Sequence, residues 1–283
     1  MAAKVIDGRA VAQDVKARVR ERADALRARG AEPCLALVLV GDDPSSQKLV
    51  ELKRKACVES SIVPRVIPLP GGTTDAELAT LIDALNADEA VHGILCQLPF
   101  PKGINEQAAL LRVAREKDVD AFSALVGAKL ADMAACTPAG VVALLDAENI
   151  EIAGKNCVVV GRSALVGRPM AMQLLLRDGT VTICHTKTRN LADFTSRADI
   201  LVVAAGSARL IGADMVKEGA TVIDVGNNWG ENGKICGDVD FEAVKEKASY
   251  ITPVPGGVGP MTIAMLMENT VAAAEGQCAA RGK

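Results

Sequence analysis

The sequence predicts an α/β fold with parallel sheets, because β-rich stretches alternate with helical stretches along its whole length. Residues 34–40 (CLALVLV) are apolar throughout, which is typical of a strand buried on both faces. Residues 157–184 contain a short apolar strand, a glycine-rich turn, an apolar helix and a second strand, which together make one βαβ unit. We therefore expect two domains, with a boundary near residues 140–155.

The first half of the chain shows strand and helix patterns with clear end signals. Asp7 can cap the first helix and Gly30 should end it, while Thr74 and Glu77 form a capping box for a later helix. Thr137 followed by proline should start the last helix of this half. The expected strands are residues 34–40, 63–69 and 91–96, and the expected helices are residues 9–29, 45–60, the stretch after 74, 105–115 and the stretch after 137.

The second half repeats this alternation, starting at the glycine-rich turn. One helix should begin near Gly167, and the last helix should run to about Glu275. The expected strands are residues 157–160, 180–184, 199–204, 221–225 and 250–253, and the shorter expected helices are residues 190–196, 213–218 and 240–248.

Composition excludes several classes of protein. The net charge of −3 gives no reason to expect a nucleic-acid surface or a polybasic membrane patch. No apolar run reaches the roughly 18–20 residues that span a bilayer, and the first residues lack the apolar region of a signal peptide. Two histidines do not predict a multi-histidine metal site, and eight cysteines without a C-x-x-C pair indicate reduced thiols in a cytoplasmic protein.

The glycine-rich turn from Gly161 to Gly167 is a candidate phosphate site. A turn of this kind directs backbone N–H groups and a helix N-terminus at an anion. Its spacing, Gly-x-Ser-x-x-x-Gly, meets the usual dinucleotide fingerprint only in part, so a purely structural turn is an equal alternative. Arg162 and Arg168 could face an adenosine 2′-phosphate, and Thr186 follows the next strand, where no acidic residue favours NAD. This pattern indicates NADP.

Three polar residues in the first half are candidates for catalysis or binding. Lys53 shares a helix face with Leu49 and Cys57, so it could be desolvated and carry a proton near neutral pH, or it could snorkel to solvent. Gln97 follows a buried strand, where parallel sheets bind ligands, or it is a loop amide. Asp120 could bind a guanidine-like ligand edge or be a solvated turn residue.

The segment PVPGGVGPMT near the C-terminus has three glycines and three prolines in ten residues. Such a segment buries little side chain and lets a ligand approach the backbone, and the alternative is a rigid lead-in to the last helix.

Together these segments resemble the bifunctional methylenetetrahydrofolate dehydrogenase/cyclohydrolase family, in the family's order and over nearly the whole chain. The segments that carry the resemblance are VGDDPSS, KAC, HGILCQLPFP, KDVDAF, CTPAG, GKNCVVVGRSALVGRPMA, TVTICHTKT, ADILVVAAG, TVIDVGNN, GDVDF and TPVPGGVGPMTIAMLMENT.

The resemblance implies that 5,10-methylenetetrahydrofolate is oxidised with NADP to the methenyl cation, which water then opens to 10-formyltetrahydrofolate. It implies a folate-site domain of residues 1–140 plus about 262–283, and a Rossmann-like NADP domain of residues 141–261, with the folate cleft between them. The C-terminal helix should pack back on the N-terminal domain. The implied partners are tetrahydrofolate one-carbon derivatives and a second copy of the chain, joined through the cofactor domain. Neither metal, nucleic acid nor membrane is expected.

The resemblance also implies residue roles. Lys53 would transfer the proton in the cyclohydrolase step, Gln97 would hydrogen-bond to it, and Asp120 would hold the pterin 2-amino edge. The residues expected at the NADP site are Gly161, Arg162, Ser163, Gly167, Arg168 and Thr186. The residues expected to contact substrate, besides Asp120, are Leu49, Gly257, Pro260 and Thr262.

Two departures from the family pattern lie in the folate half. The family has a tyrosine where this chain has Leu49, and it has Gly-Phe-His-Pro-x-Asn-x-Gly where residues 121–128 here read AFSALVGA. These departures leave two alternatives open. One is a specialised paralogue with weak or absent cyclohydrolase activity, and the other is a non-catalytic protein that binds folate or NADP.

Overall fold

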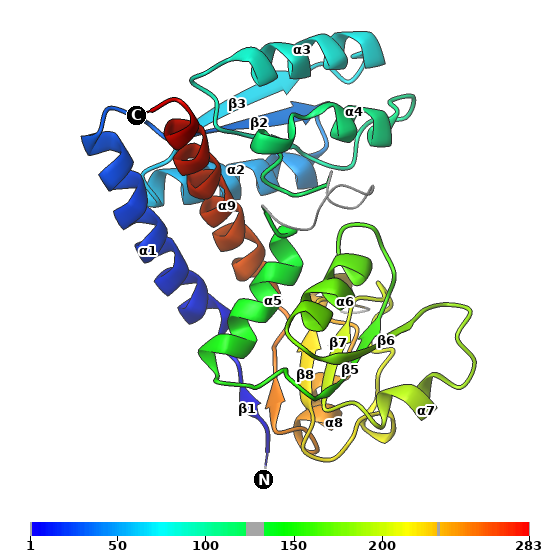
Figure 1. The fold of residues 1–283 in the computed structure, drawn as a ribbon. Coiled ribbons are helices and arrows are strands. Elements are labelled where there is room, and N and C mark those ends of the chain that lie inside the picture. Colours follow the sequence, from blue (N-terminus) through cyan, green and yellow to red (C-terminus); the bar gives the residue numbers. More distant parts are fainter. Residues whose placement is uncertain (1, 123–132, 231–232, 283) are drawn as a thin grey trace. The chain divides into compact units, whose positions relative to one another are not determined.

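The computed structural model describes residues 2–122, 133–230 and 233–282, and these residues divide into two units, each built around its own parallel sheet (Figure 1). Unit 1 comprises residues 1–12 and 137–262, and unit 2 comprises residues 13–136 and 263–283. The first twelve residues thus group with unit 1, whereas the family resemblance assigns them to the folate-site domain. Strand β1 (Lys4–Val5) pairs in parallel with β11 (Tyr250–Ile251), which places the start of the chain in unit 1.

Unit 2 contains a three-stranded parallel sheet in the order β3-β2-β4. Its strands are β2 (Cys34–Val40), β3 (Val63–Leu69) and β4 (Gly93–Cys96). The central strand β2 is buried at every position, as its continuous apolar sequence predicts. The core formed by this sheet continues into α3 (Asp75–Ala87) and α4 (Glu106–Arg112).

Local capping fixes where the helices of unit 2 begin. Asp43 caps α2 (Pro44–Glu59) by accepting a hydrogen bond from the backbone N–H of Ser46 at 2.7 Å. Thr74 and Glu77 form the predicted capping box of α3, since each side chain accepts the other's backbone N–H. These caps fix the first residues of α2 and α3.

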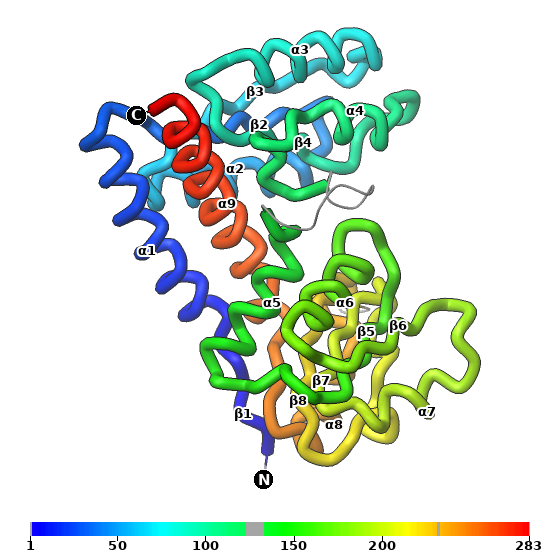
Figure 2. Tube along the Cα trace, viewed as in Figure 1, coloured from blue at the N-terminus to red at the C-terminus, as the bar shows by residue number. Residues whose placement is uncertain are grey.

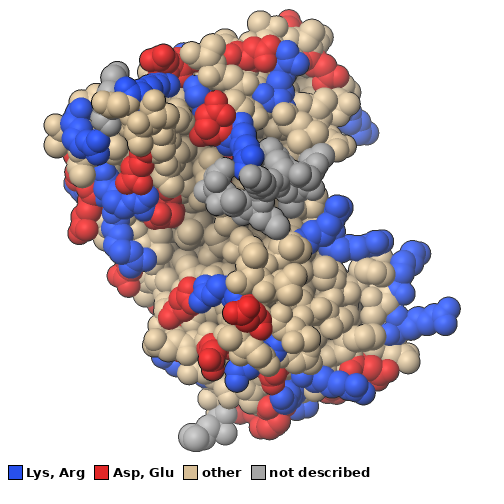
Figure 3. Space-filling view, viewed as in Figure 1, with Lys and Arg blue, Asp and Glu red and all other residues tan. Residues whose placement is uncertain are grey.

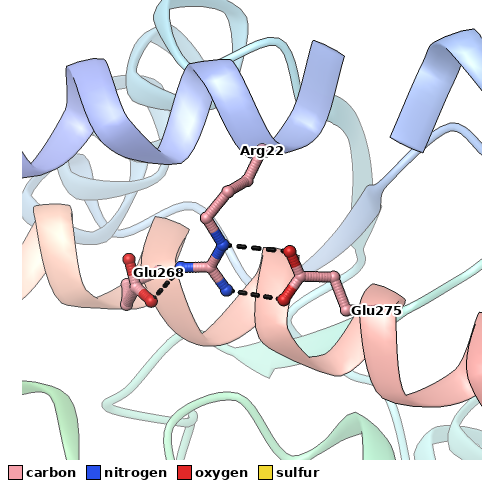
Figure 4. A network of polar contacts seen from close by, with 3 residues as sticks. All are labelled: Arg22, Glu268 and Glu275. Atoms are coloured by element: carbon pink, nitrogen blue, oxygen red, sulfur yellow. Dashed lines mark hydrogen bonds and ion pairs between the residues drawn. The ribbon is translucent and has the colours of Figure 1, made fainter. Parts of the chain in front are cut away.

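Within unit 2, residues 263–280 of the C-terminal helix α9 (Val258–Ala280) pack against residues 13–28 of α1 (Gly8–Ala28) (Figure 4). Arg22 makes a bidentate contact with Glu275, with Nε to Oε1 at 2.9 Å and Nη2 to Oε2 at 2.7 Å, and its Nη1 contacts Glu268. A bidentate guanidinium fixes both distance and orientation. The expectation that the last helix packs on the N-terminal domain is confirmed.

Unit 1 contains a six-stranded sheet in the order β1-β11-β8-β7-β5-β6, all parallel. Figure 2 follows the chain through this unit and labels β1 and β5 to β8. Its other strands are β5 (Asn156–Val160), β6 (Thr180–Cys184), β7 (Ile200–Val203) and β8 (Thr221–Asp224). Its helices are α5 (Cys136–Ala147, of which Cys136 is counted with unit 2), α6 (Gly167–Leu176), α7 (Leu191–Thr195) and α8 (Phe241–Lys245). Helix α6 packs on β5 and β6, and α8 packs on β11.

Two parts of unit 1 differ from the sequence prediction. The helix expected at residues 213–218 is a single 3-10 turn, Ala213–Met215, because Val216 turns to extended backbone and is buried in the core of the sheet. A short antiparallel pair, β9 (Asn228–Trp229) and β10 (Ile235–Cys236), was not predicted.

Candidate active site

Lys53 lies on α2 and is half-buried on the side of the helix that carries the buried residues Ala56 and Cys57. Its Nζ donates a hydrogen bond to Oε1 of Gln97 at 2.9 Å. The neighbouring Lys55 is exposed and pairs with Glu51 on the outer face. The helical spacing read from the sequence therefore places one lysine of this helix in a desolvated position.

Gln97 follows β4 directly and is only 5% exposed. Its backbone N–H donates to the carbonyl of Val38 at 2.8 Å, which extends the pairing with β2 by one residue. Its side-chain Nε2 donates to the carbonyl of Leu98 at 2.6 Å. Because the amide nitrogen is taken by a carbonyl, the amide oxygen is the atom that faces Lys53.

Asp120 is the acidic partner of Lys53 in this part of the molecule. Burial lowers the pKa of Lys53, and the negative charge of Asp120 opposes that shift. Burial raises the pKa of Asp120, and the positive charge of Lys53 opposes it in turn. Burial thus favours the neutral form of each group, while the attraction between Lys53 and Asp120 favours the charged pair.

Two residues beside Asp120 were missed by sequence reasoning, Cys136 and Asn269. Asn269 on α9 donates from Nδ2 to the carbonyls of Val119 at 2.8 Å and Ala134 at 2.9 Å. The Cys136 thiol donates to the carbonyl of Val119 at 3.3 Å. Burial raises the pKa of Cys136 well above its usual value, and the charge of Asp120 raises it further, so this thiol is a hydrogen-bond donor and not a nucleophile. The single asparagine of the last helix was the available signal.

The two departures from the family pattern have different surroundings. Leu49 lies one turn before Lys53 on α2 and is 41% exposed. Ala121 is 3% exposed and has a φ of 56°, the left-handed conformation that glycine adopts most easily. Phe122, which matches the family pattern, is half-buried, and residues 123–128 lie outside the described residues.

The glycine-rich turn of unit 1 is built from close backbone approaches. Gly161 has a φ of 128°, and a Cβ there would lie 2.1 Å from the carbonyl oxygen of Ala204. A Cβ on Gly167 would lie 2.3 Å from the carbonyl oxygen of Gly161. Ser163 Oγ accepts the N–H groups of Val166 at 3.2 Å and Gly167 at 3.3 Å, so its own O–H remains to be donated elsewhere.

Arg162 and Thr186 extend from neighbouring strand ends. Val160 pairs with Cys184 across β5 and β6, and each of the two exposed residues follows its strand by two positions. The exposed Arg168 donates from Nε to the carbonyl of Arg162 at 3.2 Å. Figure 3 shows Lys and Arg side chains projecting from the side of unit 1 on which β6 and α6 lie. A hydroxyl and guanidinium groups at one sheet edge fit a phosphate on NADP.

The remaining sequence candidates, Gly257, Pro260 and Thr262, also belong to unit 1, whereas Lys53, Gln97 and Asp120 belong to unit 2. Gly257 is tightly enclosed, since a Cβ there would lie 2.7 Å from the carbonyl oxygen of Pro253. Pro260 and Thr262 lie in the first turns of α9, so the lead-in predicted from the sequence is partly helical. The hydroxyls of Thr262 and Thr137 are 3.0 Å apart.

In the ranges that the structure describes, no group of three or more His, Cys, Asp or Glu side chains is arranged to hold a metal ion. No helix among the described residues is long and apolar enough to cross a membrane.

Comparison with known proteins gives the same family for both units. Residues 6–120 match the catalytic domain of tetrahydrofolate dehydrogenase/cyclohydrolase, and residues 135–278 match its NAD(P)-binding domain. The chain is 53% identical to the bifunctional protein FolD of Nitrosospira multiformis and 51% identical to that of Moorella thermoacetica. These alignments cover 97% of this chain in both cases, and 97% and 99% of the relatives.

Solved structures agree with these sequence relatives. The bifunctional enzyme FolD of Campylobacter jejuni is 48% identical, with a TM-score of 0.94 over 97% of this chain and 99% of that one. The methylenetetrahydrofolate dehydrogenase-cyclohydrolase of Trypanosoma brucei, solved with NADP and an inhibitor, is 37% identical, with a TM-score of 0.90 over 97% of this chain and 98% of that one.

Proposed function

The chain belongs to the tetrahydrofolate dehydrogenase/cyclohydrolase family, and from this premise we propose how its residues divide the two reactions. It is a bifunctional enzyme that oxidises 5,10-methylenetetrahydrofolate with NADP and hydrolyses the resulting methenyl cation to 10-formyltetrahydrofolate. The observation that carries the proposal is the contact between the half-buried Lys53 ammonium and the oriented amide oxygen of Gln97.

Lys53 serves the cyclohydrolase step as a proton carrier. Water adds to the electrophilic methenyl carbon, and Lys53 takes the proton that the water loses. When the bond from that carbon to N5 breaks, N5 gains a proton and the former water oxygen becomes the formyl oxygen. One proton is released overall, so neither a metal ion nor a covalent nucleophile is required. The lowered pKa of Lys53 suits this exchange near neutral pH.

Asp120 and Leu49 bind the folate in this proposal. Asp120 accepts hydrogen bonds from the 2-amino edge of the pterin, and a half-buried carboxylate gives such a contact strength and direction. Leu49 offers its exposed apolar surface to the ring system. An aliphatic side chain cannot stack on the pterin as an aromatic ring can. Such stacking contributes about 0.5–1.5 kcal/mol of binding free energy in addition to the burial of apolar surface.

Unit 1 holds the cofactor for the dehydrogenase step. Gly161 and Gly167 allow the backbone of the turn to lie close to the dinucleotide, and Arg162, Ser163 and Thr186 bind its 2′-phosphate side. Bound there, NADP would supply the acceptor for the hydride that leaves the methylene carbon. The residues of this chain orient the two reactants, and orientation is the main requirement of hydride transfer.

We further propose that the enzyme is a cytoplasmic homodimer joined through unit 1. Strand β6 lies at the edge of the six-stranded sheet and carries an exposed Ile183, as a strand covered by a second copy would. The cysteines of the described chain are all free, as in a reducing compartment. Light scattering of the purified enzyme tests the dimer, and a monomer at assay concentration would contradict it.

A paired rate measurement tests the assignment of Lys53. Lys53→Met should abolish hydrolysis of the methenyl substrate while NADP affinity is unchanged, because the cofactor residues lie in unit 1. Lys55→Met, the same change on the exposed face of α2, should leave both rates unchanged. A Lys53→Met enzyme that hydrolyses the methenyl substrate normally would contradict the assignment.

Leu49 favours a second candidate, a specialised paralogue in which the dehydrogenase outpaces the cyclohydrolase. One measurement on the unsubstituted protein distinguishes the specialised paralogue from the balanced bifunctional enzyme. Accumulation of the methenyl product during NADP reduction supports the paralogue, and its prompt hydrolysis supports a balanced bifunctional enzyme. Binding of both ligands without turnover would indicate a non-catalytic protein instead.

A further inference from the structure

Three segments of unit 1 have no role in the mechanism above, namely residues 204–207, residues 224–228 and residues 237–239. They meet at the carboxylate of Asp238, which is completely buried. Its Oδ2 accepts the backbone N–H groups of Ala205 at 2.6 Å and Gly206 at 2.9 Å, and its Oδ1 accepts that of Ser207 at 2.8 Å. One carboxylate therefore satisfies three consecutive backbone donors in the loop that follows β7.

A fourth donor completes the shell of Asp238. The side-chain Nδ2 of Asn228 donates to Oδ1 of Asp238 at 2.8 Å. Four donors around one carboxylate offset the cost of removing that group from water. The buried aspartate thus fixes the conformation of the loop. A neutral side chain in its place would leave backbone N–H groups unpaired.

A second buried carboxylate, Asp224, holds the segment that carries Asp238. It is 3% exposed, and its Oδ1 accepts the backbone N–H of Asp238 at 3.0 Å while its Oδ2 accepts that of Val239 at 2.9 Å. Its own backbone N–H donates to the hydroxyl of Thr252 at 2.8 Å. The chain of contacts runs from the end of β8 to the loop after β7.

The backbone around these carboxylates admits only glycine at two places. A Cβ on Gly237 would lie 1.8 Å from Oδ2 of Asp224. A Cβ on Gly226 would lie 2.4 Å from the backbone nitrogen of Asp238 and 2.5 Å from its carboxylate. The glycines of DVGNN and GDVDF are therefore explained by the two aspartates beside them.

The loop held by Asp238 is one wall of the glycine-rich turn. Ala204 donates its N–H to the carbonyl of Val160 at 2.7 Å, and its carbonyl oxygen occupies the space that a side chain on Gly161 would need. A shift of residues 204–207 would therefore change the space beside Gly161, where the backbone must approach the dinucleotide.

We infer that Asp238 is a positioning residue for NADP, because its carboxylate fixes the main chain of residues 204–207 against Gly161. This inference rests on the proposed cofactor site in unit 1. Asp238 itself need not touch the cofactor, since its effect is carried by the loop.

Asp238→Asn is the direct test. Whichever way the new amide turns, at least one backbone N–H of residues 205–207 faces an N–H group, so the loop loses its fixed position. The dissociation constant for NADP, measured by calorimetry, and the KM for NADP should rise about tenfold or more. The kcat at saturating NADP should change by less than about threefold. Hydrolysis of the methenyl substrate, assigned to unit 2, should be unchanged.

Asp240→Asn is the matched control, because Asp240 is two residues further along and caps α8 through the N–H of Ala243. It should leave NADP affinity unchanged. If Asp238→Asn does not fold, Asn228→Ala removes one of the four donors more gently and should raise the KM for NADP about two- to fivefold.

An unchanged NADP affinity in the folded variant would overturn the inference, and so would an equal loss of cyclohydrolase activity, which would reveal general damage. Failure of the unsubstituted protein to bind NADP would instead refute the proposed function.

Discussion

Gln97→Glu is the sharpest test of the proton carrier, because it changes one atom and places a carboxylate against Lys53. The present amide oxygen lies 2.9 Å from Nζ, and the glutamate would present a negative charge at the same distance. A negative charge favours the protonated lysine, so the pKa of Lys53 should rise. A lysine that stays protonated cannot take a proton from water.

The size of the shift follows from the distance. Two unit charges 2.9 Å apart attract by about 6 kcal/mol at an effective dielectric constant of about 20. Part of this attraction is offset, because the new carboxylate is desolvated and loses the hydrogen bond from Nε2 to the carbonyl of Leu98. A net rise of about 1–3 pH units in the midpoint for Lys53 is therefore expected.

The assay is the pH profile of methenyl hydrolysis, followed by absorbance. Below the midpoint the rate should fall about tenfold for each unit of the shift, and it should recover as the pH is raised. Gln107→Glu, the same change at an exposed position of α4, is the control. A pH midpoint equal to that of the unsubstituted enzyme would refute the role given to the contact between Lys53 and Gln97.

Three further outcomes are expected. Ala121→Gly should raise the free energy of unfolding by up to about 1 kcal/mol, because glycine adopts the left-handed backbone of this position without strain. Ala114→Gly, at a position with φ of −60°, should lower the free energy of unfolding instead. Chemical denaturation measures both changes, and equal effects would contradict the reasoning. Burial raises the pKa of Asp224 to about 6, so the folded state binds this proton more tightly than the unfolded chain. The contribution of Asp224 to stability should therefore fall by up to about 3 kcal/mol as the pH rises from about 4 to about 6, and then level off. Unfolding of the protein and of Asp224→Asn across this range isolates that contribution, and a constant difference would exclude the shift. Leu49→Tyr should lower the KM for folate by about two- to tenfold through ring stacking, and steady-state kinetics would show an unchanged KM if Leu49 does not contact the substrate.

The strands and helices of both units were predictable where the signal is local. The continuous apolar sequence of β2 is enough to predict that the strand is buried, whichever strands lie beside it. Thr74 and Glu77, three residues apart, are enough to predict where α3 begins. Strand β1 was not predictable in this way. Two residues carry no periodicity, and β1 exists because it pairs with β11, more than two hundred residues away.

The candidate site shows the same division. Helical spacing put Lys53 on the inner face of its helix, and the rule for parallel strands placed Gln97 at a strand end, so these two positions were predictable from local patterns. Their contact was implied only by the family resemblance. Asn269 contacts the carbonyl of Val119 from the other end of the chain. Neither residue has a neighbour in sequence that indicates the contact, so only the fold could supply it.

The two halves of the site differ in how much change each can accept. At Gly161 a single Cβ would collide with the carbonyl of Ala204, so any substitution must move the backbone of the glycine-rich turn. At position 121 the backbone is also left-handed, yet alanine occupies it, which costs about 1–2 kcal/mol in conformation. Leu49 replaces an aromatic ring on an exposed surface and forfeits only what that ring supplied. A change at Leu49 therefore alters one side-chain contact, whereas a side chain at Gly161 would require the main chain itself to move.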